Sequence, residues 1–508
     1  MSRWTPARIG LWGGAALLVA LLLLPAPDGL SGAGWRVAAV GLAMAVWWMT
    51  EALPIAATSL VPVVAFPVLG VASVDEAAAP YASPIVLLFL GGFLLAKAME
   101  RWGLHRRVAL SVLDRVGGAP RRVLAGFIAT AGLLSMGISN TATAVMMLPI
   151  ASSAAATLRE DGAPGAFDTT LLLGVAYACS VGGMGTLIGT PTNALLAGFV
   201  AEAYGVDLSF AGWLAVGLPF ALLGLAVVYA VLLRFPARVG GVAPERAAAF
   251  AAWVRATRAE LGPASPPERR VGAVFAAVAA LWTTRPLWGA LVPGASDAGV
   301  ALLGALVLFA APAGRSAPPR PRSAEAGGAE SAGGAARLLD WPTAVTIPWG
   351  VLLLFGGGLS LAAAVDGSGL AVWIGGRLGG AAALPPLLVV GAVVAVVVVL
   401  TELTSNTATA AAFLPVLAAL PFAADPLVVL VAVTFAASCA FMLPVATPPN
   451  AIVFGSGRVE IGQMMRAGAV LNVVFVVLAT AWCALAVPAL VDLVLPGLPA
   501  PPAGAPGP

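Results

Sequence analysis

Two stretches of the chain place small hydroxyl and amide side chains in segments that are otherwise apolar. Residues 135–149 read Ser-Met-Gly-Ile-Ser-Asn-Thr-Ala-Thr-Ala-Val-Met-Met-Leu-Pro, and residues 401–415 read Thr-Glu-Leu-Thr-Ser-Asn-Thr-Ala-Thr-Ala-Ala-Ala-Phe-Leu-Pro. Both contain Ser-Asn-Thr-Ala-Thr-Ala and both end in Leu-Pro. Hydroxyl and carboxamide groups donate and accept hydrogen bonds, and their oxygens suit a hard cation. The repetition therefore predicts one polar site built by two related halves.

A second pair of polar motifs follows these stretches, at residues 189–193 (Gly-Thr-Pro-Thr-Asn) and 446–450 (Ala-Thr-Pro-Pro-Asn). Proline interrupts a helix, and backbone groups freed inside a membrane are tolerated only where they line a cavity or bind a ligand. Helix N-termini favour anions, and free carbonyls at helix C-termini favour cations. We expect ten side chains to converge: Ser135, Ser139, Asn140, Thr141 and Thr190 of one half, and Thr401, Ser405, Asn406, Thr407 and Thr447 of the other.

The motifs contain no Arg, Lys or His that could neutralise a bound anion. Moving a dianion into a low-dielectric site without a countercharge is costly. Sodium bound beside the anion would supply that charge, which gives a physical reason for coupling the two.

The elements that must position these motifs are membrane helices. The chain has 508 residues, of which 60% are hydrophobic and 10% charged, and its mean hydropathy is +0.99. Soluble domains carry about 25% charged residues, so the composition indicates an all-α polytopic membrane protein. With about 20 apolar residues per span, we predict helices near 9–26, 35–50, 53–72, 84–113, 169–201, 211–235, 271–292, 297–313, 343–380, 425–457 and 463–495.

An internal repeat organises these helices. Ser139 and Ser405 lie 266 positions apart, as do Gly103 and Gly369, whereas Thr190 and Thr447 lie 257 apart. With the first helix set aside, each half holds an odd number of full spans, so the halves insert with opposite orientation. This is the inverted-repeat plan of secondary transporters, whose substrate sites lie at broken helices near the midplane.

Arginines set the predicted sidedness through the positive-inside rule. They gather in the segments 101–122, 234–270 and 314–340, with Arg36 and Arg377 as exceptions. The count favours about eleven spans plus two re-entrant hairpins, a cytoplasmic N-terminus and an external C-terminus. We therefore divide the chain into an N-terminal helix (1–34), a first repeat (35–235, with hairpin 122–157 and broken helix 169–201), a cytoplasmic linker (236–270), a second repeat (271–495, with disordered loop 314–340, hairpin 385–420 and broken helix 425–457) and a tail (496–508).

The paired Ser-Asn-Thr motifs resemble those of a known family, the divalent anion–sodium symporters. The stretch 47–54 (Trp-Trp-Met-Thr-Glu-Ala-Leu-Pro) and the Gly-Thr-Pro-Thr-Asn motif add to the similarity, which runs from about residue 35 to 490. The resemblance implies an elevator-type homodimer in the cytoplasmic membrane, which couples sodium to import of C4-dicarboxylates such as succinate, malate and fumarate. The implied partners are a small dicarboxylate or other divalent anion, sodium, membrane lipid and a second copy of the chain, with no nucleic acid.

The resemblance also assigns roles to residues. It implies one sodium site with Ser135, Ser139, Asn140 and the carbonyl of Gly189, and another with Thr401, Thr404, Asn406 and the carbonyl of Ala446. It implies that the substrate carboxylates meet Asn140, Thr141, Thr190, Asn406, Thr407, Thr447 and Pro448. One departure is that the glycines 182, 183 and 185 before the first break have no counterparts before Thr447.

Several alternatives stay open at this point. Within transport, they are a sodium-independent exchanger of di- or tricarboxylates and a carrier of sulfate or another inorganic oxyanion. A membrane-embedded enzyme would want a cluster of His, Asp or Glu at membrane depth, and Glu402 alone does not make one. Glu402 itself is open to two interpretations, structural pairing and direct sodium ligation, because its counterpart in the first half is Met136.

Overall fold

The computed structural model describes residues 5–158, 166–235, 243–314, 336–377, 385–420 and 425–494. These residues form helices and turns, with one isolated β-bridge between Pro312 and Arg337 and no strand. Six helical segments of the described chain are long and apolar enough to cross a membrane: Val74–Arg101, Asn140–Leu158, Phe210–Leu232, Pro266–Leu291, Trp349–Gly367 and Ile461–Leu485. The prediction of an all-α polytopic protein is confirmed. Which further helices cross completely, and on which side the termini lie, stay predictions.

The helices before the linker are α1 (Pro6–Leu23), α2 (Gly32–Thr50), α3 (Ile55–Thr58), α4 (Val61–Val68), α5 (Val74–Ala78), the 3-10 helix η1 (Ala79–Ala82), α6 (Pro84–Arg101), α7 (Leu104–Asp114), α8 (Pro120–Ser135), α9 (Asn140–Leu158), α10 (Ala166–Gly183), α11 (Pro191–Tyr204) and α12 (Phe210–Leu232). The remaining elements are α13 (Pro244–Glu260), α14 (Pro266–Trp288), η2 (Gly289–Leu291), α15 (Asp297–Ala310), α16 (Trp341–Ala344), α17 (Trp349–Gly367), α18 (Leu370–Arg377), α19 (Pro386–Thr401), α20 (Asn406–Ala418), α21 (Pro426–Ala437), α22 (Pro448–Gly455), α23 (Ile461–Leu485) and α24 (Val487–Val494).

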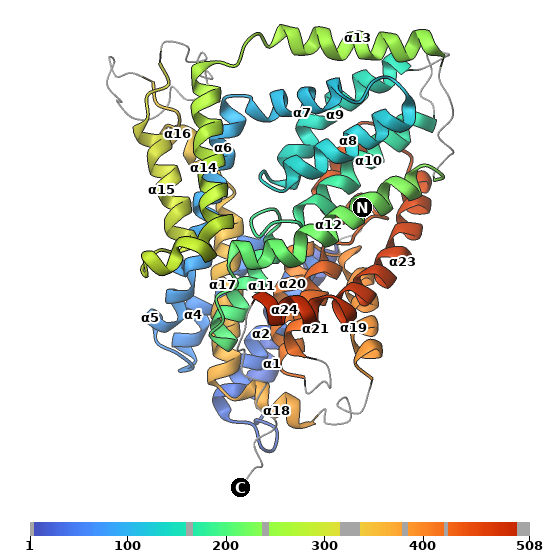
Figure 1. Cartoon of the computed structure of the whole chain (residues 1–508). Coiled ribbons are helices and arrows are strands. Elements are labelled where there is room, and N and C mark those ends of the chain that lie inside the picture. The colour runs from blue at the N-terminus through green and yellow to red at the C-terminus, as the bar shows by residue number, and fades with distance from the viewer. Residues whose placement is uncertain are drawn as a thin grey trace.

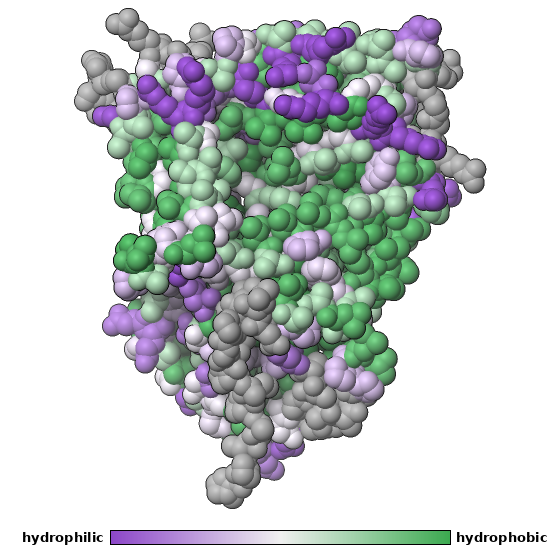
Figure 2. All heavy atoms as spheres, in the orientation of Figure 1, coloured by the Kyte–Doolittle hydropathy of each residue, from purple (hydrophilic) through white to green (hydrophobic). Residues whose placement is uncertain are grey.

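One end of the molecule is strongly hydrophilic. The helices α7 and α13 lie across this end, roughly at right angles to the upright helices α6, α14 and α15, which pack against one another (Figure 1). Figure 2 shows hydrophilic side chains gathered there, above a broad hydrophobic belt. Large apolar side chains are exposed on the upright helices as well, such as Leu303 and Leu306 on α15, which are 58% and 64% exposed. A lipid-facing surface explains such exposure, because the hydrocarbon core accepts apolar side chains.

Two helical hairpins occur where they were predicted. In the first, α8 and α9 are joined by residues 136–139, and in the second, α19 and α20 are joined by residues 402–405. The first pair lies toward the hydrophilic end and the second toward the opposite end (Figure 1). Each Ser-Asn-Thr motif therefore forms the tip of its hairpin and the start of the second arm.

The broken helices follow the same plan. Residues 184–190 separate α10 from α11, and residues 438–447 separate α21 from α22. The packing is crossed: α9 of the first half contacts α22 of the second, and α20 of the second contacts α11 of the first. The two halves therefore interlock at their hairpins and breaks.

Two of the predicted helices are each split at a glycine. We predicted continuous helices over 84–113 and 343–380, but Gly103 and Gly369 have φ angles of 70° and 75° and separate α6 from α7 and α17 from α18. Glycine adopts this left-handed conformation without the steric cost that a Cβ imposes. The two breaks are repeat counterparts, and α7 and α18 lie at opposite ends of the molecule (Figure 1). The predicted helix 53–72 is likewise wrong in detail, because α3 and α4 are separate.

Part of the predicted disordered loop 314–340 is structured. Leu338 and Leu339 are fully buried, the indole of Trp102 donates to the Leu338 carbonyl at 2.7 Å, and Arg101 forms a 2.7 Å ion pair with Asp340. The apolar Leu-Leu pair explains the correction, because it gives this short segment a buried anchor. Residues 315–335 and the tail 496–508 lie outside the described residues.

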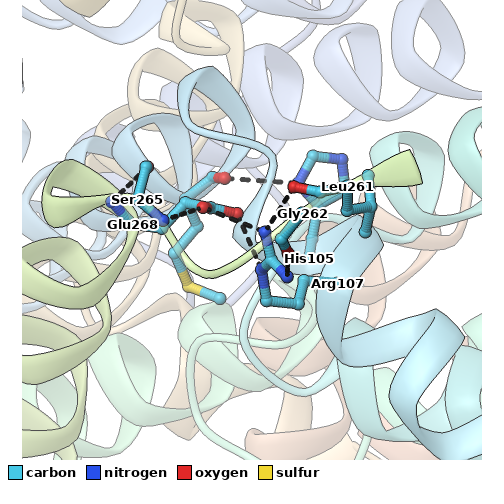
Figure 3. Close-up of polar contacts among 7 residues, drawn as sticks. His105, Arg107, Leu261, Gly262, Ser265 and Glu268 are labelled. Atoms are coloured by element: carbon cyan, nitrogen blue, oxygen red, sulfur yellow. Dashed lines mark hydrogen bonds and ion pairs between the residues drawn. The ribbon is translucent and has the colours of Figure 1, made fainter. Parts of the chain in front are cut away.

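The linker is fastened to the surface helix α7 by Arg107. Its guanidinium forms two hydrogen bonds of 3.0 and 3.2 Å with the Glu268 carboxylate and donates to the carbonyls of Leu261 and Gly262 (Figure 3). Glu268 also accepts from the backbone amide of Ser265, which starts α14 with a capping box. The two-pronged geometry of arginine suits this carboxylate. The first helix of the second half is thus tied to the arm that leads into the first hairpin.

Candidate functional site

The first half-site forms where α8 ends and α9 begins. Ser135 is fully buried, and its hydroxyl lies 2.5 Å from Asn140 Oδ1 and 2.8 Å from the Cys179 carbonyl of α10. Ser139 caps the start of α9, because its hydroxyl accepts from the Ala142 amide at 3.2 Å. The sequence achieves this geometry by placing a hydroxyl residue five positions before the asparagine that opens the second arm.

The second half-site repeats this geometry with Thr401 in place of serine. The Thr401 hydroxyl lies 2.8 Å from Asn406 Oδ1 and 2.8 Å from the Ala437 carbonyl of α21. Thr401 is fully buried, like its counterpart. The predicted pairing of the halves therefore extends from the sequence to individual contacts.

Both half-sites crowd oxygens around one hydroxyl. A hydroxyl carries a single proton, so Ser135 donates either to Asn140 or to the Cys179 carbonyl, and Thr401 faces the same choice. In each half one close pair of oxygens is left without a proton between them. A cation among these oxygens would satisfy the remaining pair, and neutral oxygens are the ligands that hard cations take.

The break in α10–α11 brings a backbone carbonyl to the first half-site. A methyl group added at Gly183 would lie 2.7 Å from Asn140 Oδ1 and 3.0 Å from the Gly189 carbonyl oxygen. The space beside Gly183 is therefore bounded by two of the predicted cation ligands. A side chain at this position would fill it, which explains why glycine stands here.

Two asparagines that the sequence reasoning did not select hold the breaks in shape. Asn193 donates to the carbonyls of Gly183 and Thr186 at 3.1 and 2.8 Å. Its counterpart Asn450 donates to the equivalent pair, Ala440 and Leu443, at 3.2 and 3.1 Å, and both asparagines are fully buried. The signal was present in the sequence, because both asparagines close the repeated proline motifs at a step of 257.

The residues assigned to substrate binding lie at four helix N-termini. Asn140 and Asn406 open α9 and α20, while Thr190 and Thr447 are the N-cap residues of α11 and α22. Thr190 and Thr447 are buried, 4% and 3% exposed. Unpaired amides and the helix dipole make such N-termini favourable for anions.

The structure connects the assigned residues unevenly. Near Thr190, the Thr192 hydroxyl lies 2.9 Å from Ser438 and so joins the two halves directly. The Thr404 hydroxyl is instead engaged with the Leu400 carbonyl at 2.9 Å and with Thr409 at 2.6 Å. Among the described residues, the hydrogen bonds that join two assigned side chains are Ser135 with Asn140 and Thr401 with Asn406. None in this part of the chain joins another assigned side chain to Ser139, Thr141, Thr190, Thr404, Thr407, Thr447 or Pro448.

Glu402 forms a structural contact. It is 5% exposed and accepts hydrogen bonds from the backbone amides of residues 441–443, the loop that interrupts α21 and α22, and from the side chain of Asn472 on α23. Of the two interpretations left open by the sequence, structural pairing is the one the geometry shows. Both carboxylate oxygens are engaged by protein donors.

A family model and two similar proteins indicate the same family of transporters. Residues 9–490 match the model described as the sodium:sulfate symporter transmembrane region. The protein named sodium-dependent dicarboxylate transporter SdcS of Staphylococcus saprophyticus is 40% identical over 482 residues, covering 92% of this chain and 89% of the relative. The protein of the same name in Staphylococcus aureus is 39% identical over 481 residues, covering 92% and 88%.

A solved structure supports the fold. The crystal structure of the YdaH transporter of Alcanivorax borkumensis superposes with a TM-score of 0.56 at 14% identity, covering 95% of this chain and 98% of the other. At that identity the likeness concerns the fold alone. The match over nearly the whole chain, together with relatives at about 40% identity, shows that this membrane protein belongs to the sodium:sulfate symporter family and is a transporter rather than an enzyme.

Proposed function

We propose that the protein imports C4-dicarboxylates such as succinate, malate and fumarate by symport with sodium. The observation that carries this proposal is the repeated oxygen cluster, Ser135 with Asn140 and Thr401 with Asn406, at the tips of two hairpins. The relatives named as sodium-dependent dicarboxylate transporters, at about 40% identity, support the choice of ion and substrate.

Sodium would bind once in each half. The first site would use Ser135, Ser139, Asn140 and the Gly189 carbonyl, and the second would use Thr401, Thr404, Asn406 and the Ala446 carbonyl. In each half, one hydroxyl lies close to two acceptor oxygens but has a single proton to donate, which supports this assignment. The engagement of Thr404 with Thr409 means that its hydroxyl would contribute a lone pair without leaving its present partner.

The dianion would lie between the four helix N-termini. Its carboxylates would meet Asn140, Thr141, Thr190, Asn406, Thr407, Thr447 and Pro448. These groups are neutral, so two sodium ions supply the positive charge that the site lacks. With more than two sodium ions per dianion, the membrane potential would also drive uptake, by about 2.3 kcal/mol per net charge per 100 mV.

Transport would proceed by an elevator movement within a homodimer in the cytoplasmic membrane. The hairpins and broken helices would move together against a scaffold that includes α14 and α15, and the breaks at Gly103 and Gly369 would let the arms α7 and α18 follow. The arginine-rich end would face the cytoplasm, with the N-terminus inside and the C-terminus outside.

Uptake of labelled succinate into proteoliposomes tests the proposal. We expect accumulation only with an inward sodium gradient, and competition by excess fumarate but not by sulfate. Uptake that needs internal dicarboxylate and ignores sodium would identify an exchanger instead. Competition by sulfate alone would identify an oxyanion carrier.

A further inference from the structure

The two halves hold equivalent loops by different means. In the second half, Glu402 and Asn472 meet at 2.7 Å beside the loop of residues 441–443. In the first half, a methyl group added at Gly185 would lie 3.1 Å from the Met136 side chain and 3.2 Å from Ala221 Cβ. Met136 is the repeat counterpart of Glu402, so an apolar contact stands where the second half has a buried carboxylate.

The correspondence of Ala221 with Asn472 rests on a pair of close-packed glycines. A methyl group at Gly217 of α12 would lie 2.5 Å from the Met184 carbonyl, and one at Gly468 of α23 would lie 2.2 Å from the Phe441 carbonyl. Gly217 and Gly468 are 251 positions apart, which is also the separation of Ala221 and Asn472. The last helix of each half thus presses on the same loop at the same point.

The first loop satisfies its own amides. Met184 donates to the Val181 carbonyl at 3.2 Å and Gly185 to the Gly182 carbonyl at 2.9 Å. Glycine permits this tight path, since a methyl group at Gly182 would lie 2.3 Å from the carbonyl oxygen of Gly132. These two amides therefore need no outside carboxylate, and among the described residues the only hydrogen bond from this loop to the hairpin tip is from the Thr186 hydroxyl to the Met136 carbonyl.

The second loop lacks those glycines and uses Glu402. Its amides at Phe441, Met442 and Leu443 donate to the carboxylate at 2.7, 2.8 and 3.0 Å. Hydrogen bonds to an ionised acceptor are about twice as strong as neutral ones. No salt bridge joins Glu402 to an arginine or lysine in the described ranges of the chain, so these donors are what stabilises the buried charge.

The loop held by Glu402 leads directly to the second cation site. Leu443 is bound on both sides, because its amide donates to Glu402 and its carbonyl accepts from Asn450 at 3.1 Å. The same carbonyl accepts from the Ala446 amide at 3.3 Å. Glu402 lies next to Thr401 in the chain, so one residue connects the hydroxyl ligand to the loop that carries the carbonyl ligand.

We propose that Glu402 is the positioning residue of the second sodium site, taking the role that glycines 182, 183 and 185 have in the first. This inference rests on the proposed function and names the residue that fixes the loop leading to Ala446, whose carbonyl is the proposed fourth ligand. Groups that orient metal ligands typically contribute about 10–100-fold to metal affinity. Loss of Glu402 should therefore weaken sodium binding without a matching effect on the substrate.

The test compares Glu402→Gln and Asn472→Ala with the control Met136→Leu, a volume-conserving change at the first-half counterpart. Sodium half-saturation is measured twice, from succinate uptake and from sodium-dependent thermal stabilisation of the purified protein without substrate. We expect Glu402→Gln to raise the sodium concentration needed for half-saturation about 10-fold or more. Asn472→Ala keeps the charge and three amide contacts, so we expect about a threefold rise. Met136→Leu should stay within about twofold, as volume-conserving substitutions do.

At saturating sodium, the KM for succinate should change by less than about threefold in all three variants. The substitutions are expected to weaken sodium binding and to leave the contacts with succinate in place, and a raised KM would report the loss of such contacts. If Glu402→Gln does not insert, Asn472→Ala alone decides the question. Unchanged sodium half-saturation, or a rise in the succinate KM in its place, would overturn the role of Glu402. Sodium-independent uptake by the unmodified protein would overturn the proposed function instead.

Discussion

The asparagines that close the two breaks give the sharpest test of how the site is held. We predict that Asn193→Leu and Asn450→Leu each destabilise the protein and reduce uptake at least tenfold. Each change keeps the approximate size of the side chain but removes a buried amide that donates to two loop carbonyls, at 3.1 and 2.8 Å for Asn193 and at 3.2 and 3.1 Å for Asn450. Uptake falls because the same loops carry the predicted carbonyl ligands of sodium.

The expected change in the free energy of unfolding follows from the buried polar groups that lose or keep a hydrogen-bond partner. The carbonyl of Gly183 or Ala440 loses its side-chain donor, which costs about 1–3 kcal/mol. The carbonyl of Thr186 or Leu443 keeps a donor in the amide of Gly189 or Ala446, so the bond lost there costs about 0.5–1.5 kcal/mol. The side-chain oxygens of Asn193 and Asn450 have no hydrogen-bond partner, so leucine removes one unsatisfied acceptor and returns about 1–3 kcal/mol. The net destabilisation is about 1 kcal/mol for either variant, which corresponds to a loss of about two degrees in Tm.

Thermal unfolding of purified protein and succinate uptake by proteoliposomes together measure the effect. Leu195→Met, on the same helix as Asn193, is the control, because volume-conserving swaps in packed regions usually cost less than about 1.5 kcal/mol. The two asparagine variants should behave alike, since their contacts are equivalent. Wild-type uptake and stability in either variant would refute the reasoning.

Three further outcomes are expected. Asn140→Ala and Asn406→Ala should each abolish succinate uptake while leaving insertion intact, and normal uptake by either would contradict the site assignment. Gly468→Ala should destabilise the protein by about 1–3 kcal/mol, because its methyl group would lie 2.2 Å from a loop carbonyl and the core is overpacked; calorimetry measures this. Burial alone would raise the pKa of Asp340, but the hydrogen bonds from Arg101 and Thr343 and the charge of Arg101 together outweigh it and hold the pKa below its ordinary 3.8. The pair therefore stabilises the protein at neutral pH by up to about 1 kcal/mol; this contribution should fade as the pH falls below 3.8, and Asp340→Asn should remove it from a pH series of unfolding curves.

Much of the architecture could be predicted because repetition is visible in the sequence. The steps of 266 and 257 located both hairpins and both breaks, and the repeated polar motifs predicted one site built by two related halves, which includes Ser135 and Thr401. Helix breaks at Gly103 and Gly369 were missed for a physical reason. The residues on both sides of each glycine form helix, so a single left-handed glycine was the only sign of the break.

The contacts of Glu402 could not be read from its position. An acid beside a hydroxyl motif is compatible with ligating sodium and with capping a loop, and the difference depends on where residues 441–443 and Asn472 lie in space. Their separation in the chain, 39 and 70 positions from Glu402, hides the contact. The loss of glycines before Thr447 was visible, and the structure shows that a carboxylate stands in for them.

The coupling of the two fluxes tests the central claim most directly. Labelled sodium and labelled succinate are followed in the same proteoliposomes, each with and without the other. A site in which sodium supplies the charge that the protein lacks predicts that neither moves alone, and that at least two sodium ions, one for each half-site, enter per succinate. Succinate flux that persists at full rate without sodium, or sodium flux that ignores succinate, would contradict it.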